Sequence, residues 1–230
     1  SDMEALLRKK RVPLSTLESG IPLNKLHILG FSLQYELSYT NVLAMLDLGG
    51  IPLYSRDRAK DDPIVIGGGP AAYNPEPVAE FFDAFLLGDG EAAVLEMSDA
   101  VIEGRGKGED RREILVRLST IEGVYVPSFF DVNYNLDGTV KEIVPLIKGY
   151  TRVTRRVVPD INKLDLPVRP IVPFLETIHD RVSVEISRGC TRGCRFCQAG
   201  NLYRPVRERT PENIVAIIDG ALKSTGYDEV

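Results

Sequence analysis

Short apolar runs alternate with helical patterns along the first hundred residues. Four runs predict buried strands, at 26–34, 51–55, 63–69 and 84–91. Val42, Leu43 and Leu46 recur on one helical face, and the pair Gly49-Gly50 predicts where that helix ends. A second helix is predicted from Ala92 to about Ile102. This alternation predicts an α/β protein with βαβ units and a doubly wound parallel sheet.

The pattern changes after the second helix. Residues 104–113 are densely charged and predict a surface loop. Residues 123–146 alternate apolar and polar positions around Asp137-Gly138, which predicts an antiparallel hairpin at the sheet edge. A proline-rich stretch at 151–180 predicts an ordered connector between two domains, residues 1–150 and 181–230.

The predicted second domain begins with a period-two strand at 181–187. A helix follows, with Thr210 as its N-cap, Pro211 in its first turn and Gly226 after its end. Its predicted buried stripe consists of Ile214, Ile217, Ile218 and Ala221. A new strand is expected at 228–230. One strand and one helix cannot bury their own apolar faces, so we expect a truncated larger barrel. The chain also opens inside a helical pattern, and both ends predict a fragment of a longer protein.

Composition narrows the class of protein. The chain is 43% hydrophobic and 27% charged, with a net charge of −5, which disfavours bulk nucleic-acid binding. No apolar run approaches the roughly 18 residues that span a bilayer, and no secretory leader is visible. Free cysteines close together suggest a reducing compartment, so we expect a cytoplasmic protein without membrane partners.

All three cysteines, Cys190, Cys194 and Cys197, lie within eight residues, directly after a predicted strand. Three thiolates on one loop can converge on an inorganic centre and leave one metal position open, as iron–sulfur clusters and catalytic zinc sites do. Gly189 and Gly193 let the backbone bend tightly around such a centre. Phe196 precedes the third cysteine and offers an aromatic ring to cover a bound ligand.

The segment CTRGCRFC resembles the cluster loop of the radical S-adenosylmethionine superfamily, whose signature is Cys-x3-Cys-x-aromatic-Cys. The upstream segment IVIGGGPAAYNPEPVAEFFDAFLLGDGE is similar to the cobalamin-binding-like domain, Rossmann- or flavodoxin-like in fold, that precedes the barrel in one subgroup. The whole chain is most similar to an uncharacterised bacterial family of such fusion proteins, with its first strand missing. The fold implied is that domain followed by the first β/α unit of a truncated TIM-like barrel.

The resemblance implies a function. Cys190, Cys194 and Cys197 would ligate a [4Fe-4S] cluster, and the remaining iron would bind S-adenosylmethionine. One electron from a donor such as flavodoxin or ferredoxin would cleave this cofactor to methionine and a 5′-deoxyadenosyl radical, which abstracts hydrogen from a substrate. Phe196 would lie near the adenine. The substrate stays open, RNA included, and the fragment alone is expected to be inactive.

Other interpretations of the same residues stay open. The three cysteines with His179 would form a Cys3His zinc site, although the spacing fits poorly, and the chain would then be a ligand-binding or interaction module with a structural metal loop. Disulfide pairing conflicts with the odd count. Phe196 is equally well explained as core packing.

Three further features are candidates for ligand contacts. His27 matches half of the cobalamin-ligand motif Asp-x-His-x-x-Gly, but Lys25 stands at the acidic position, so cobalamin is unexpected on this chain and stays open for a longer protein. Glycine turns at 67–69 and 88–90 end two strands, at the edge where open α/β sheets bind ligands. Six arginines surround the cysteines and either serve the cluster, a cofactor carboxylate or RNA, or form a solvated face: Arg188, Arg192, Arg195, Arg204, Arg207 and Arg209.

Overall fold

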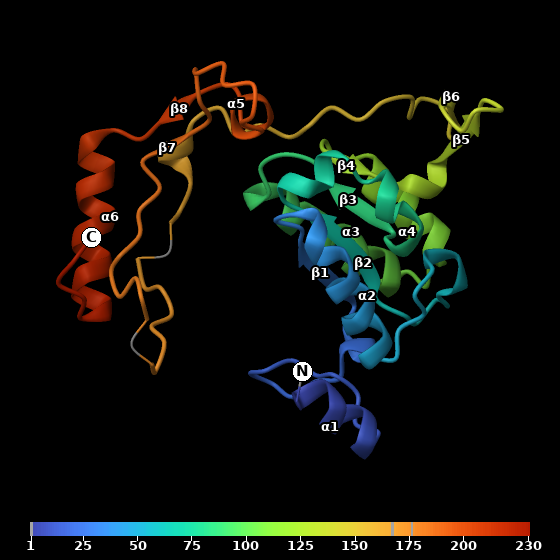
Figure 1. The fold of residues 1–230 in the computed structure, drawn as a ribbon, viewed down its shortest axis with the longest axis horizontal. Helices are drawn as coiled ribbons and strands as arrows, with labels where there is room; N and C mark the ends of the chain where they lie inside the picture. The colour runs from blue at the N-terminus through green and yellow to red at the C-terminus, as the bar shows by residue number, and fades with distance from the viewer. Residues whose placement is uncertain (1, 167, 176) are drawn as a thin grey trace. The chain divides into compact units, whose positions relative to one another are not determined.

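The computed structural model describes residues 2–166, 168–175 and 177–230. Two compact units make up the chain, Ser1–Val157 and Val158–Val230 (Figure 1). The predicted division into 1–150, 151–180 and 181–230 stays a prediction, and two residues of its connector, Pro167 and Glu176, lie outside the described residues, as does Ser1. Within the described ranges, no helix is long and apolar enough to cross a membrane.

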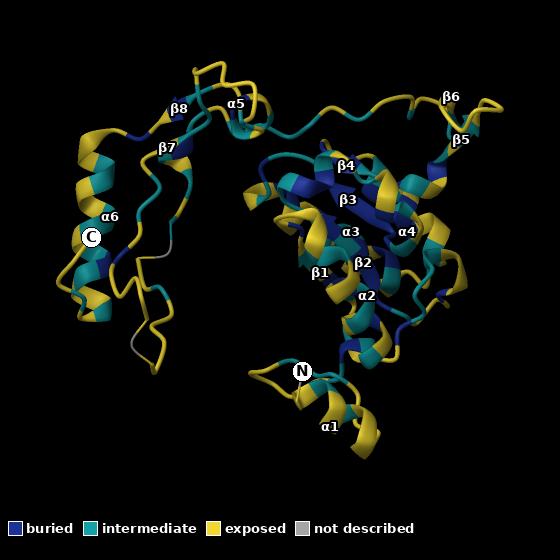
Figure 2. Ribbon diagram, in the orientation of Figure 1, coloured by how far each residue is buried: buried dark blue, intermediate teal, exposed yellow. Residues whose placement is uncertain are grey.

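A four-stranded sheet forms the centre of the first unit, in the order β1-β2-β3-β4. Strands β1 (Ile28–Ser32), β2 (Ile64–Gly68) and β3 (Ala84–Leu86) are parallel, and the short β4 (Val124–Tyr125) runs antiparallel to β3. Figure 2 shows β2 and β3 as the most buried part of this unit. The predicted α/β class with a mainly parallel, Rossmann-like sheet is confirmed.

Helices cover both faces of the sheet. Side chains alternate across a strand, so β3 sends Phe85 into one apolar cluster and Leu86 into the other. The first cluster includes Val42 and Leu46 of α2 (Tyr39–Leu48), as the predicted stripe requires, and the 3-10 helices η4 (Pro70–Tyr73) and η5 (Glu76–Phe81). The second cluster packs α3 (Glu91–Gly106) and α4 (Arg111–Ser119) on the opposite face.

The remaining short elements connect these layers. Helix α1 (Asp2–Lys10) forms where the sequence predicts a helical start, and it has no buried residue. The other 3-10 helices of this unit are η1 (Leu23–Lys25), η2 (Glu36–Ser38), η3 (Ser55–Asp57) and η6 (Pro127–Phe129).

The strand predicted at 51–55 is absent from the sheet. Ile51 is buried, but the carbonyls of Pro52 and Leu53 accept hydrogen bonds from the guanidinium of Arg58, at 3.0 and 2.8 Å. Pro52 also lacks the N–H group that a ladder needs. The apolar run is therefore a buried loop, and its backbone acceptors are taken by a side chain.

The charged loop predicted at 104–113 is largely helical. Helix α3 continues to Gly106, because Gly104 is buried against Ile114 and a Cβ there would lie 2.8 Å from the Ile114 side chain. Helix α4 then begins after Asp110, which forms a reciprocal capping box with Glu113. The prediction from charge density was wrong for all but the few residues between the helices.

The predicted hairpin is confirmed, but its place was wrong. Strands β5 (Phe130–Tyr134) and β6 (Val140–Pro145) pair antiparallel and form a sheet of their own. Gly138 has φ of +84°, as the turn requires. The antiparallel edge of the main sheet is instead β4, whose Val124 carbonyl accepts a hydrogen bond from the Tyr150 hydroxyl at 2.6 Å. Burial raises the pKa of Tyr150 to about 12.

Among its described residues, the second unit contains a 3-10 helix, two short paired strands and two helices. These are η7 (Ile161–Lys163), β7 (Ser187–Arg188) with β8 (Arg207–Glu208), α5 (Ala199–Leu202) and α6 (Pro211–Thr225). Helix α6 has the predicted cap, since the Thr210 hydroxyl accepts the Asn213 N–H and Gly226 is left-handed. In its predicted stripe, Ala221 is buried and the three isoleucines are half-buried.

The strand predicted at 181–187 was wrong except at its last residue. Among the described residues of this region, the Val182 N–H donates to the Glu229 carbonyl at 3.0 Å. Ladder pairing with another strand begins only at Ser187. No strand forms at 228–230 either. The predicted truncated TIM-like barrel therefore stays a prediction.

One ion cluster holds the amino-terminal end of the sheet together. The carboxylate of Asp83, 1% exposed, accepts from the guanidinium groups of Arg58 and Arg111 at 2.9 and 2.6 Å, and from the Val65 N–H at 2.7 Å. Arg58 also donates to the Phe81 carbonyl at 2.7 Å. Burial lowers the pKa of Arg58, although Asp83 opposes that shift. Asp83 thus compensates two buried or half-buried cations.

Replacing Asp83 by Asn should strongly destabilise the chain. The substitution keeps the shape but leaves Arg58 buried without its counter-charge, which typically costs about 3–5 kcal/mol of unfolding free energy. Urea unfolding measures the change. As a control, Glu80→Gln removes an exposed pair with Arg56 and should cost about 0–1 kcal/mol. Equal losses for the two variants would contradict this role of Asp83.

Candidate functional site

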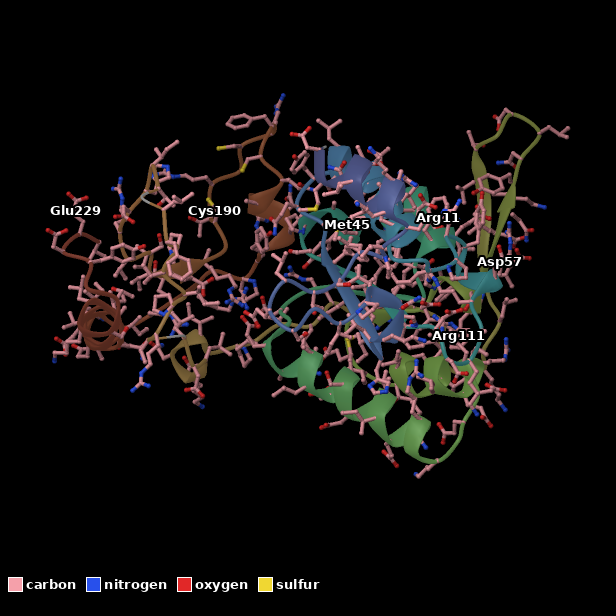
Figure 3. All side chains as sticks on the ribbon, turned by 90° about the horizontal axis from the view of Figure 1, so that it is seen from below. Arg11, Met45, Asp57, Arg111, Cys190 and Glu229 are labelled. Atoms are coloured by element: carbon pink, nitrogen blue, oxygen red, sulfur yellow. The ribbon has the colours of Figure 1, made fainter. Side chains whose placement is uncertain are left out.

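The three cysteines lie on a loop that a two-residue ladder closes at its base. Ser187 pairs with Glu208 and Arg188 with Arg207, so residues 189–206 form a loop between β7 and β8. Figure 3 labels Cys190, the first cysteine of this loop. Both ends of the loop are therefore held by backbone pairing, and the three cysteines lie between them.

Gly189 marks the closest approach of the two arms of the loop. A Cβ at this position would lie 2.5 Å from the Tyr203 carbonyl oxygen and 2.9 Å from that of Pro205. Its φ of +97° is also one that residues with a side chain rarely adopt. Gly193 differs, because a Cβ there would meet nothing within 4 Å. Of the two glycines that the sequence singled out, only Gly189 is required by the loop as it stands.

Two of the six arginines are buried, contrary to a solvated face. Arg207 is 7% exposed and donates to the carbonyls of Pro205, Tyr203 and Val158, at 3.1, 3.4 and 2.8 Å. Arg209 is 4% exposed and donates to the Asn213 side chain at 2.9 Å. Arg192, Arg195 and Arg204 are exposed, and Arg188 is half-buried.

A polar network connects the start of the loop to helix α6. Glu185 receives two hydrogen bonds from Arg188, at 2.8 and 2.9 Å, and lies 3.9 Å from the Arg209 guanidinium. The Asn162 side chain accepts the Thr210 N–H at 2.8 Å, next to the helix cap. Sequence reasoning missed Glu185 and Asn162. The only available signal was a carboxylate inside an apolar run.

The cysteine side chains are free thiols. Cys194 is exposed, and Cys190 and Cys197 are half-buried. The Arg192 N–H points at the Cys190 sulfur, 3.4 Å away, and the Cys197 N–H donates to the Cys194 carbonyl at 3.2 Å. Across the described residues, no three His, Cys, Asp or Glu side chains are gathered closely enough to hold a metal ion.

The donor set nevertheless fits an iron–sulfur cluster. Three thiolates are the ligands that such clusters take, and a backbone N–H already faces one of the sulfurs. Metal sites commonly assemble only as the metal binds. His179 is exposed and lies near Arg181, and among the described residues it is not gathered with the cysteines. Because the three cysteines are not gathered with one another either, the Cys3His zinc site stays an alternative.

Phe196 is 93% exposed, so its ring is not packed into either unit of this chain. The ring stands between Cys194 and Cys197, on the exposed part of the loop. It is therefore free to cover a ligand held by the cysteines.

The first unit places His27 and the glycine turns at opposite edges of the sheet. His27 lies just before β1, at the amino edge, where its carbonyl accepts the Ile64 N–H. The glycines at 67–69 end β2 and those at 88–90 follow β3, both at the carboxyl end of the sheet. His27 therefore lies at the opposite end of the strands from the end where such sheets bind ligands. This position agrees with the interpretation of His27 as a strand-end residue.

Comparison with known proteins identifies the family of the first unit. Residues 1–127, more than half of the chain, match the family described as "Radical SAM proteins, N-terminal". The chain belongs to this family. The match covers the α/β unit and ends well before the cysteines, so family membership and the cysteine motif are separate observations.

One relative of this radical SAM N-terminal chain is an uncharacterized protein of Methanocaldococcus jannaschii, 27% identical over 202 residues. The alignment covers 86% of this chain and 36% of the relative. The chain thus spans about a third of the length of that protein.

Substituting Gly189 by Ala should loosen the cysteine loop. The added Cβ collides with backbone rather than with a movable side chain, so the two arms must separate. Trypsin, which cleaves after the exposed Arg192 and Arg195, should then cut the loop several-fold faster. Gly193→Ala is the matched control and should leave the rate nearly unchanged. Equal rates in the two variants would refute the close contact at Gly189.

Proposed function

We propose that the chain is part of a radical S-adenosylmethionine enzyme and that Cys190, Cys194 and Cys197 hold its [4Fe-4S] cluster. The observation that carries the proposal is the agreement of two separate segments. The family match rests on residues 1–127, whereas the cluster motif lies at 190–197. Neither segment contributes to the other's assignment.

When bound, the cluster would supply the electron that cleaves S-adenosylmethionine reductively to methionine and a 5′-deoxyadenosyl radical. The chain's own residues have simpler tasks. The three thiolates anchor three irons and leave one position without a cysteine. The Arg192 N–H supports the charge on the Cys190 sulfur. Gly189 and the buried Arg207 keep the base of the loop closed, and the exposed Phe196 is available to cover the adenine.

The whole protein extends this proposal. Residues from 181 onward would begin a TIM-like barrel, with α6 as its first helix, and the half-buried isoleucines of α6 would face barrel neighbours. A reductase partner of the flavodoxin or ferredoxin class and a cytoplasmic location follow from the same assignment. The substrate stays open, because no described residue identifies it.

Anaerobic reconstitution of the full-length protein tests the proposal. About four irons and four sulfides per chain are expected. The reduced protein should release 5′-deoxyadenosine from S-adenosylmethionine, even slowly without substrate. Cys190→Ala, Cys194→Ala or Cys197→Ala should each abolish this, since one iron then lacks its anchor. Phe196→Ala should keep the iron content, weaken cofactor binding and leave thermal stability unchanged, because the ring is exposed.

Two results would contradict the proposal. One zinc per chain, with no visible absorbance and no cleavage, would support a structural metal loop instead. Full cleavage activity in any of the three cysteine variants would remove those thiols from the site.

Cobalamin gives a separate expectation for this chain. His27 lies at the amino edge and Lys25 replaces the acid that would orient it, so hydroxocobalamin should show no His27-dependent change in its visible spectrum. A titration with the chain and with His27→Ala measures this. Tight binding whose spectrum changes in the variant would overturn the assignment.

A further inference from the structure

A cavity of about 510 Å³ in the first unit is lined on one side by η5 and on the other by residues 125–134. The first side carries Glu76, Glu80 and Phe81. The second side runs from Tyr125 of β4 to Tyr134 at the end of β5. The volume is within the range of cavities that take small molecules.

Four aromatic residues line this cavity: Phe81, Tyr125, Phe130 and Tyr134. The rings of Tyr125 and Phe130 pack against each other, with centroids 5.3 Å apart. Tyr134 is 61% exposed, so its ring is accessible to a ligand. The face of an aromatic ring is electronegative and attracts a cation that lies within about 6 Å of its centroid. The aromatic lining therefore favours a positively charged occupant over an anion.

The charged side chains of the lining leave one negative charge without a counter-charge. The Arg56 guanidinium donates to Glu80 at 3.3 Å and lies over the Tyr54 ring, 4.5 Å from its centroid. These two charges therefore compensate each other. Among the described residues, Glu76 accepts its hydrogen bond from the neutral phenol of Tyr125, at 2.5 Å, rather than from a cation.

Tyr125 holds the Glu76 carboxylate in place. Its ring stacks on Phe85, and its backbone belongs to the main sheet through the pairing of β4 with β3. Burial raises the pKa of Tyr125, and the hydrogen bond to Glu76 raises it further, so the phenol stays protonated and keeps donating at neutral pH. One carboxylate oxygen is thus bound to a rigid element, and the other is available to a ligand.

Two other kinds of occupant match this lining less well. A neutral molecule would remove water from the Glu76 carboxylate without supplying a counter-charge, which costs free energy. A divalent metal ion needs several oxygen ligands, whereas the described His, Cys, Asp and Glu side chains form no group of three. An organic cation supplies both a charge for the carboxylate and a hydrocarbon part for the rings.

We infer that this cavity binds an organic ammonium ion, with its charged nitrogen at the Glu76 carboxylate and its hydrocarbon part against the aromatic rings. The ammonium group donates hydrogen bonds to Glu76, whose position Tyr125 fixes. The rings of Phe130 and Tyr134 contact the carbon atoms next to the nitrogen, which share its positive charge. This site uses none of the cysteines and goes beyond the proposed radical chemistry.

Phenethylamine, a cation at neutral pH, and phenethyl alcohol, its uncharged counterpart, serve as probes in calorimetric titrations of the 230-residue chain. We expect saturable binding of the amine and about tenfold weaker binding of the alcohol, because only the amine compensates Glu76. Glu76→Gln should weaken the amine about tenfold and leave the alcohol nearly unchanged. The glutamine carbonyl still accepts the Tyr125 hydrogen bond, so the fold of the cavity is kept.

The matched control is Glu142→Gln, on β6, where the carboxylate accepts from the Asn133 side chain at 3.3 Å and does not line the cavity. It should bind the amine as the unsubstituted chain does. Tyr134→Ala should bind the amine several-fold more weakly, whereas Tyr134→Phe should bind it unchanged. Both should keep the unfolding midpoint, because this side chain is largely exposed. Cys190→Ala should also bind unchanged, so failure of the cluster and failure of this site are separate results.

The inference fails if the unsubstituted chain does not bind phenethylamine saturably, or if the amine and the alcohol bind equally well. Equal losses of amine binding in Glu76→Gln and Glu142→Gln would also overturn it, since the charge would then act without contact. A change of oligomeric mass in Tyr134→Ala, measured by light scattering, would mean that a second copy of the chain covers the cavity instead.

Discussion

The cysteine loop depends on one backbone contact, the approach of Gly189 to the carbonyls of Tyr203 and Pro205. No residue with a side chain fits there, so the loop can close only with glycine at this position. The buried guanidinium of Arg207 then binds the carbonyls that the contact brings together. The three cysteines lie between the two paired ends of this loop. That arrangement suits a loop that must rearrange around an inorganic cluster while staying attached to its unit.

A comparable constraint holds the first unit. The carboxylate of Asp83 compensates the charges of two arginines at the amino-terminal end of the sheet. One of them, Arg58, also donates a hydrogen bond to the Leu53 carbonyl in the loop after α2. The opposite, carboxyl-terminal end borders a cavity of about 350 Å³ whose described lining residues are uncharged. The charged network thus stabilises one edge, whereas the other is left apolar and open, as in α/β proteins that bind ligands at their carboxyl edge.

Local signals predicted the elements whose structure is locally determined. Helix α6 carries its own cap at Thr210 and its own stop at Gly226, and β2 and α2 were equally clear. The errors arose where distant side chains decide the structure. Residues 51–55 have the composition of a strand, but the guanidinium of Arg58 binds the carbonyl groups that a ladder would need. Residues 104–113 have the composition of a surface loop, but the packing of Gly104 on Ile114 extends helix α3 into them. At the candidate site, the sequence indicated the cysteines and Phe196, but the burial of Arg207 and Arg209 depends on contacts of loop carbonyls and α6 that no sequence pattern shows.

The central claim is that three thiols hold a cluster whose one open iron meets S-adenosylmethionine. Electron paramagnetic resonance of the reduced, reconstituted full-length protein tests it most directly. The account predicts a signal from a reduced [4Fe-4S] cluster whose g-values shift when S-adenosylmethionine is added, because the cofactor then binds the iron itself. A cluster signal that the cofactor leaves unchanged, or no cluster signal at all, would contradict it.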